Sequence, residues 1–226
     1  MALHPSLLQQ FSLLRLLPAE ALAALAMRAS THTFAKREVV LPKETPTQSL
    51  MFLLEGRLQA VDFTLDGREV GLHFIEEGAY FGEISVLDGL PPPEIIIANK
   101  KSQVVMVPAR EARGYIFATP PAIEAMTSGL AKRIRAQSSQ RQILGIINPL
   151  QRICALLQKL TEEGRSKDLI EDAPTHQEMA IMVNLTRETV TRAFQVLQSQ
   201  GALARDGDNL KVDAAKLKKI AEKSSD

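Results

Sequence analysis

The chain has 226 residues, of which 45% are hydrophobic and 23% are charged. This profile is typical of a globular protein with one large domain or, as we expect here, two smaller ones. No apolar stretch approaches the roughly 20 residues that span a bilayer. The first residues carry neither a basic leader nor a cleavage site, so we expect a cytoplasmic protein with no membrane partner. Cys154 is the single cysteine, which excludes an internal disulfide and a multi-cysteine metal site, and we expect no metal.

The net charge of +1 is spread evenly along the chain. Residues 1–147 carry 15 basic and 14 acidic side chains, and residues 148–226 carry 12 of each. A nucleic-acid-binding surface in such a chain must therefore gather its positive charge on one face.

Residues 34 to about 108 contain short apolar runs separated by turn residues, at a spacing of roughly 8–12 residues. Asp66 and Gly67 are a strong hairpin signal because both tolerate positive φ. A short helix over residues 18–28 precedes this region. The pattern predicts an antiparallel barrel or sandwich, with strands at residues 39–41, 50–54, 58–65, 70–75, 95–98 and 104–107.

From about residue 121 to residue 147, apolar residues recur at alternating steps of three and four. This heptad-like stripe predicts a long helix that meets a second copy of itself, so we expect a homodimer. Packing of the helix on its own barrel is the alternative. Asn148 and Pro149 end the helix, because the residue before proline avoids the helical conformation, and we expect a hinge there. The residues expected at the dimer interface are Ile123, Met126, Leu130 and Ile134, and the stripe continues through Gln137, Arg141 and Leu144.

Residues 150–226 return to helical spacing. The first helix covers residues 150–160, and we interpret Cys154 on it as a small buried hydrophobe. Two short helices follow. Residues 203–212 then have the pattern of two strands around a polar turn, a wing.

The two short helices are expected at residues 175–183 and 186–199. Thr175 and Glu178 match a capping box, because hydroxyl and carboxylate can each satisfy a free backbone amide. Asn184 tolerates the left-handed conformation that the turn needs. Thr186 can cap the second helix. The spacing predicts a helix–turn–helix.

The second of these helices separates an apolar face from a polar face, at about 100° per residue. The polar face suits base reading, because arginine can donate two hydrogen bonds to guanine and glutamate can accept one from cytosine. A solvated amphipathic helix with no DNA role is the alternative. The apolar face comprises Val190, Ala193, Phe194 and Leu197, and the polar face comprises Arg187, Glu188, Thr191, Arg192 and Gln195.

Two segments carry a resemblance to the cyclic-AMP receptor/fumarate-nitrate regulator (Crp/Fnr) superfamily. One is THQEMAIMVNLTRETVTRAFQVLQSQGAL, which is similar to its winged helix–turn–helix, and the other is GAYFGEISVLDGLP, which is similar to its effector-domain signature. The order of elements agrees over about residues 10–215. The resemblance implies an α+β fold: an N-terminal antiparallel β-roll (a jelly roll of the cyclic-nucleotide-binding kind) over residues 1–118, a dimerisation helix and hinge over residues 119–148, and a winged helix–turn–helix over residues 149–226.

The string RETVTR is close to the form found in cyclic-AMP receptor proteins. The resemblance therefore implies a transcription regulator that reads TGTGA-like half-sites with Arg187, Glu188 and Arg192. It implies double-stranded DNA, a second copy of the chain and RNA polymerase as partners. His176 stands where the family has an arginine, so one phosphate contact is expected to be weaker. The phosphate contacts implied by the match are Thr175, Gln177, Thr186 and Thr189.

In the family's nucleotide site, a Gly-Glu pair holds the ribose and an Arg-Ser pair holds the cyclic phosphate. Gly82 and Glu83 match the first pair, and they either bind an effector or serve only the turn. The second pair is replaced by the PPPE segment at residues 91–94, so a phosphodiester would lose its guanidinium and meet Glu94. We therefore expect no cyclic AMP or cyclic GMP bound in the usual way, and we assign no cofactor.

Other effectors stay open, among them a cyclic dinucleotide, a metabolite or none at all. The chain lacks the cysteine cluster of the fumarate-nitrate type, and we interpret His73 as a structural residue rather than a haem ligand. Two further functions are a small-molecule binding module without a DNA role and a cupin-type enzyme. The enzyme needs a cluster of metal ligands, so we expect no enzyme activity: the histidines, His4, His32, His73 and His176, are scattered along the sequence.

Overall fold

The computed structural model describes residues 2–63, 69–164, 166 and 168–223. Two compact units make up the chain, Met1–Arg133 and Ile134–Asp226. The hairpin turn expected at Asp66 and Gly67 lies outside the described residues. In the part of the chain that is described, no helix is long and apolar enough to cross a membrane.

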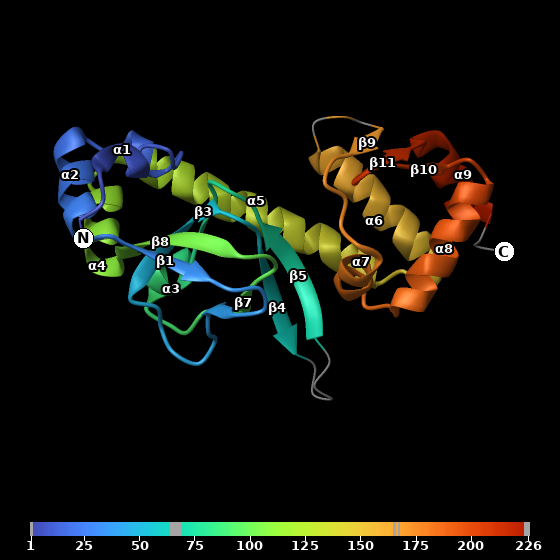
Figure 1. Ribbon diagram of the computed structural model, residues 1–226, viewed down its shortest axis with the longest axis horizontal. Coiled ribbons are helices and arrows are strands. Elements are labelled where there is room, and N and C mark those ends of the chain that lie inside the picture. The colour runs from blue at the N-terminus through green and yellow to red at the C-terminus, as the bar shows by residue number, and fades with distance from the viewer. Residues whose placement is uncertain (1, 64–68, 165, 167, 224–226) are drawn as a thin grey trace. The chain divides into compact units, whose positions relative to one another are not determined.

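The first unit contains a β-roll of two antiparallel sheets (Figure 1). The strand order is β1-β8-β3-β6 in one sheet and β2-β7-β4-β5 in the other. Each predicted strand is confirmed within the described residues, with small shifts of its ends, and residues 64 and 65 of the strand predicted at 58–65 lie outside them. The strands are β1 (Ser30–Phe34), β2 (Val39–Leu41), β3 (Ser49–Glu55), β4 (Leu58–Phe63), β5 (Glu69–Ile75), β6 (Tyr80–Phe81), β7 (Ile95–Ala98) and β8 (Ser102–Pro108).

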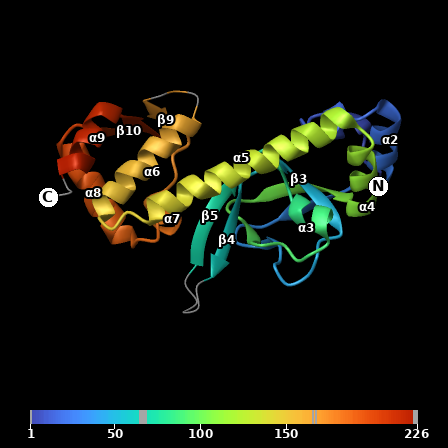
Figure 2. The same cartoon turned by 180° about the vertical axis from the view of Figure 1, so that it is seen from behind.

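Helices cover one end of the roll, where α1, α2 and α4 gather in both views (Figures 1 and 2). Their apolar faces share a core with one face of β3 and β8, in which the rings of Phe11 and Phe52 lie 4.8 Å apart. The helical segments are α1 (Pro5–Leu8), the 3-10 turn η1 (Leu14–Leu16), α2 (Ala19–Arg28), α3 (Glu83–Asp88) and α4 (Ala109–Phe117).

The helix α5 (Pro120–Leu144) contributes to both units. The division falls inside it rather than after residue 148, because its last turns are held by the second unit. The Gln140 side-chain amide donates to the Met182 carbonyl oxygen at 2.6 Å, and Ile143 is buried. Beside the hinge expected at Asn148 and Pro149, Arg152 donates to the Ile146 carbonyl oxygen from both Nε and Nη2, at 2.8 and 2.6 Å.

The second unit is a helical core with a small sheet of order β10-β11-β9. Cys154 is fully buried on its first helix, as expected. Its elements are α6 (Pro149–Glu163), β9 (Leu169–Ile170), α7 (His176–Met182), α8 (Arg187–Ser199), β10 (Leu203–Asp206), β11 (Asn209–Val212) and α9 (Ala214–Lys223).

Candidate DNA interface and effector pocket

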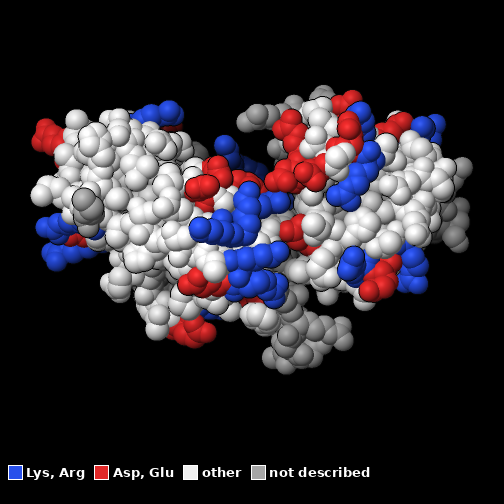
Figure 3. All heavy atoms as spheres, in the orientation of Figure 1, with Lys and Arg blue, Asp and Glu red and all other residues white. Residues whose placement is uncertain are grey.

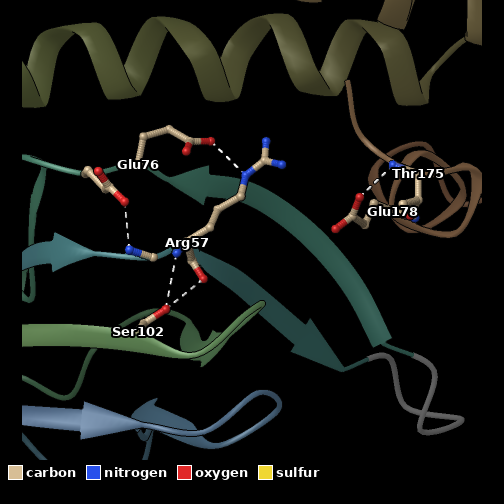
Figure 4. A network of polar contacts seen from close by, with 7 residues as sticks. Arg57, Glu76, Ser102, Thr175 and Glu178 are labelled. Carbon is tan, nitrogen blue, oxygen red and sulfur yellow. Dashed lines mark hydrogen bonds and ion pairs between the residues drawn. The ribbon is translucent and has the colours of Figure 1, made fainter. Parts of the chain in front are cut away.

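The helix α7 begins with the predicted capping box (Figure 4). The Thr175 amide donates to Glu178 Oε2 at 2.6 Å, and the Glu178 amide donates to Thr175 Oγ1 at 3.3 Å. Two backbone donors that the first turn would leave without partners are thereby satisfied. The start of α7 is fixed by its own side chains.

The turn into α8 depends on Asn184, whose φ of 50° is left-handed, as expected. Thr186 caps α8, because its Oγ1 accepts a hydrogen bond from the Thr189 amide at 3.2 Å. Substitution of such a cap by alanine costs about 1 kcal/mol. The turn and the cap together fix where α8 begins and which way its side chains face.

The apolar face of α8 is buried, and the predicted base-reading side chains lie on the opposite, exposed face. Val190, Phe194 and Leu197 are each no more than 3% exposed. Arg187, Glu188 and Arg192 are exposed. The second unit therefore presents two guanidinium groups and one carboxylate on the outer face of a rigid helix, the donor and acceptor types that read guanine and cytosine.

The carboxylate of Glu188 is held in its charged form. Its pKa lies below the usual range because it accepts hydrogen bonds from its own backbone amide and from the Thr186 hydroxyl, with smaller contributions from Arg187 and Arg192. An ionised carboxylate is an acceptor only, which suits the exocyclic amine of cytosine.

His176 has a contact that the sequence did not predict. Its Nδ1 lies 3.0 Å from the Thr191 hydroxyl, and its ring centroid lies 4.3 Å from that of Phe194. The Thr191 hydroxyl also donates to the Arg187 carbonyl oxygen at 2.9 Å, so this side chain is engaged within the unit. Burial, and then the charges of Arg205 and Arg187, lower the pKa of His176. These effects favour the neutral imidazole, and the ring ties α7 to α8.

The residues predicted to contact phosphate lie at the start of the two helices. Thr175, Gln177 and Thr186 are exposed, and Thr189 is half-buried. Thr189 Oγ1 lies 3.4 Å from Arg192 Nη2 and 3.0 Å from the Thr186 hydroxyl. On the face drawn in Figure 3, Lys and Arg atoms are interleaved with Asp and Glu atoms, in keeping with the even charge of the sequence.

In the first unit, Gly82 and Glu83 begin α3. Gly82 has a φ of 78°, and a Cβ there would lie 3.4 Å from the Ser49 carbonyl oxygen, so this turn favours glycine. Glu83 is 1% exposed, and its Oε1 forms an ion pair with Arg133 Nη1 from α5. Burial raises the pKa of Glu83, and the charge of Arg133 opposes that shift. Arg133 lies 50 residues from Glu83 in the sequence, so no local pattern indicated this partner.

The pocket beside Glu83 is small, with a volume of about 10 Å³. Glu94, the residue that ends the PPPE segment, is 6% exposed and lines the same pocket. Among the described residues lining it, Arg133 is the single cation, and its guanidinium is already bound to Glu83. A buried cyclic phosphate is stabilised by a cation of its own. The lining residues are Leu41, Gly82, Glu83, Ile84, Ser85, Pro92, Pro93, Glu94, Ile96 and Arg133.

Comparison with known proteins places both units in one family. Residues 31–118 match the cyclic nucleotide-binding domain, and residues 151–220 match the Crp-like helix-turn-helix domain. The chain belongs to the Crp/Fnr superfamily.

Relatives within this superfamily agree over most of their length. A cAMP-activated global transcriptional regulator CRP from Pasteurella multocida is 24% identical over 80% of this chain and 88% of its own. A CRP-like cAMP-activated global transcriptional regulator from Mycobacterium tuberculosis is 25% identical over 84% and 87%. The solved structure of FixK2 from Bradyrhizobium japonicum superposes with a TM-score of 0.72, at 18% identity over 85% of this chain and 96% of its own, and shares the fold.

This Crp/Fnr chain is accordingly a DNA-binding transcription regulator with a cyclic nucleotide-binding domain, and not an enzyme. Within the part of the chain that the structure describes, no three metal-ligating side chains are grouped to hold a metal ion. The match to the Crp-like helix-turn-helix domain sets aside the alternatives of a small-molecule binding module without a DNA role and of a cupin-type enzyme.

One residue of the predicted dimer seam is misplaced. Met126 is 2% exposed and packs in the core of the first unit, so its side chain is not on the surface of that unit. The heptad pattern could not tell a side chain that packs in the core of its own unit from one that faces a second copy of the chain. Ile123 and Leu130 are half-buried, whereas Ile134 is 67% exposed. Of these four side chains, Ile134 is the most exposed.

Proposed function

We propose that this Crp/Fnr regulator binds a palindromic operator with TGTGA-like half-sites as a homodimer, and that each α8 reads one half-site. The observation that carries the proposal is the exposed group of Arg187, Glu188 and Arg192 on a helix whose opposite face is buried. The arginines would each bind a guanine through O6 and N7, and Glu188 would accept from a cytosine amine.

Phosphate contacts would position α8 in the major groove. Thr175, Gln177 and Thr186 are exposed at the starts of α7 and α8, where side-chain hydroxyl and amide groups can donate to phosphate oxygens. Thr189 is half-buried beside Arg192 and can donate at the edge of the same surface. His176 has a lowered pKa and contacts Thr191, which favours a weaker backbone contact than an arginine would make.

Pairing of α5 with its copy would supply the second recognition helix. Ile134 is an exposed apolar side chain on this helix, and Leu130 and Ile123 are partly exposed along the same stripe. A twofold dimer would place half-site centres about one helical turn apart, roughly 34 Å. RNA polymerase would be the further partner of such a regulator, and activation or repression would depend on where the operator lies.

The effector domain would not use cyclic AMP in the family's usual way. The pocket carries two buried carboxylates, and its one described guanidinium is bound to Glu83. Gly82 and Glu83 remain the residues at which another effector would bind.

Substitutions on α8 test the base-reading assignment. Arg187→Ala and Arg192→Ala should each weaken operator binding by about 1–3 kcal/mol and relax discrimination at one base pair. Gln198→Ala, an exposed change in the last turn of α8, is the matched control and should leave specificity unchanged. Competition gel shifts with single-base operator variants measure both quantities. A uniform loss across all sequences would show that the arginine contacts only phosphate.

A further inference from the structure

The effector pocket contains a carboxylate oxygen without a donor. Arg133 binds Glu83 through Oε1, whereas Glu83 Oε2 is buried and accepts no hydrogen bond from the residues that the structure describes. Leaving a buried charged acceptor unsatisfied costs more than leaving a neutral one. Glu83 Oε2 therefore marks a position at which a hydrogen-bond donor from outside the chain would be stabilised.

Glu94 brings a second buried carboxyl to the same pocket. Burial raises its pKa to about 7, and the neighbouring charge of Glu83 acts in the same direction. The charged groups that face it are Arg133 and Lys43, which favour the carboxylate, Glu83 and Asp62, which oppose it, and the His73 ring, whose Nε2 lies 3.6 Å from Glu94 Oε1.

The net charge of the lining residues determines whether an anion or a cation is favoured in the pocket. With both carboxyls ionised, the lining residues carry two negative charges against the one positive charge of Arg133. An anion would be repelled, whereas a cation with N–H groups would satisfy Glu83 Oε2 and neutralise Glu94. A divalent metal fits less well, since it needs about six oxygen ligands and the described residues offer no cluster of three metal-ligating side chains.

We propose that the pocket between α3 and residues 92–96 binds the ammonium group of a small primary amine, held between the carboxylates of Glu83 and Glu94. The pocket volume of about 10 Å³ accommodates a group the size of one water molecule, and an ammonium nitrogen has that size. The proposal rests on the proposed function only in treating the amine as the effector, since binding itself requires no DNA.

Methylammonium chloride is the probe that tests this site in the full chain. At pH 8 and constant ionic strength, methylammonium should raise the Tm of the first unit saturably. Tetramethylammonium, which has the charge but no N–H donor, should not, and neither should sodium chloride. Glu94→Gln should remove the methylammonium response, whereas Glu55→Gln, an exposed change in the same unit, should retain it. Equal responses to the two ammonium ions, or an unchanged response in Glu94→Gln, would overturn the proposal.

The pH dependence gives a second readout. Binding to the carboxylate of Glu94 requires loss of its proton, so methylammonium should bind about tenfold more weakly at pH 6 than at pH 8. His73→Gln should keep this pH dependence if Glu94 is the titrating group, and loss of it would assign the effect to His73. Stabilisation by cyclic AMP that depends on Glu83 would also contradict the cation assignment.

The two proposals fail separately. If methylammonium does not bind while operator binding is intact, the ammonium site is wrong and the DNA assignment stands. If methylammonium binds and no operator is recognised, the ammonium site stands and the DNA assignment is wrong.

Discussion

Replacement of Glu94 by glutamine should stabilise the first unit by an amount that grows with pH. Glu94 is 6% exposed, and burial raises its pKa from 4.5 to about 7. Between these values the unfolded chain releases the proton and the folded unit keeps it. The contribution of Glu94 to the stability of the first unit is therefore fully present below about pH 4.5. It decreases progressively as the pH rises to about 7.

The size of the effect follows from the difference between 7 and 4.5, which at roughly 1.4 kcal/mol per pH unit is about 3 kcal/mol. Glutamine has nearly the same shape and no charge, so the variant avoids this loss. Glu94→Gln should differ from wild type by less than about 1 kcal/mol at pH 5 and be up to about 3 kcal/mol more stable at pH 8.

Tyrosine fluorescence during urea unfolding measures this difference in the first unit alone. The chain has two tyrosines, Tyr80 and Tyr115, and no tryptophan, and both tyrosines lie in that unit. Glu55→Gln, an exposed change, should give a curve parallel to wild type between pH 5 and pH 8. A Glu94→Gln variant that tracks wild type over this range, or that is less stable at pH 8, would refute the assignment of a buried carboxyl with a raised pKa.

Three other predictions concern packing. Cys154 is fully buried, and burial raises its pKa to about 11. A thiol reagent at pH 8 should therefore label Cys154 only after unfolding. Rapid labelling of the native chain would contradict this. Leu197→Ala should cost about 2–5 kcal/mol of stability by circular dichroism, because a fully buried side chain on α8 is removed. A Cβ at Gly129 would lie 2.4 Å from Tyr80 Oη, so Gly129→Ala should yield the usual helix gain of about 1 kcal/mol only when combined with Tyr80→Phe.

The helices and strands that the sequence predicted are those marked by a local signal, either an apolar run or a helix cap. The strands of the roll are short apolar runs, and α7 and α8 carry their own caps at Thr175 and Thr186. β1 was missed because Ser30–Phe34 is polar along most of its length. Its place comes from pairing with β8, from Ser30 against Met106 to Phe34 against Ser102, which no local pattern records.

The candidate sites divide in the same way. The base-reading face of α8 is a periodicity within one helix and could be predicted. The ion pair of Glu83 with Arg133 joins α3 to α5, and the contact of His176 with Thr191 joins α7 to α8. Both depend on tertiary packing. Met126 was assigned to the dimer interface but packs in the core of the first unit. A heptad stripe identifies an apolar seam without identifying what packs on it.

Selection of bound sequences from a random duplex library tests the central claim most directly. The full chain at moderate salt should enrich a palindrome of two TGTGA-like half-sites whose centres are about one helical turn apart. Arg192→Ala should enrich the same palindrome with one position of each half-site relaxed. Enrichment of no sequence, or of a motif that Arg187→Ala and Arg192→Ala leave unchanged, would contradict the assignment of α8 as the reading helix.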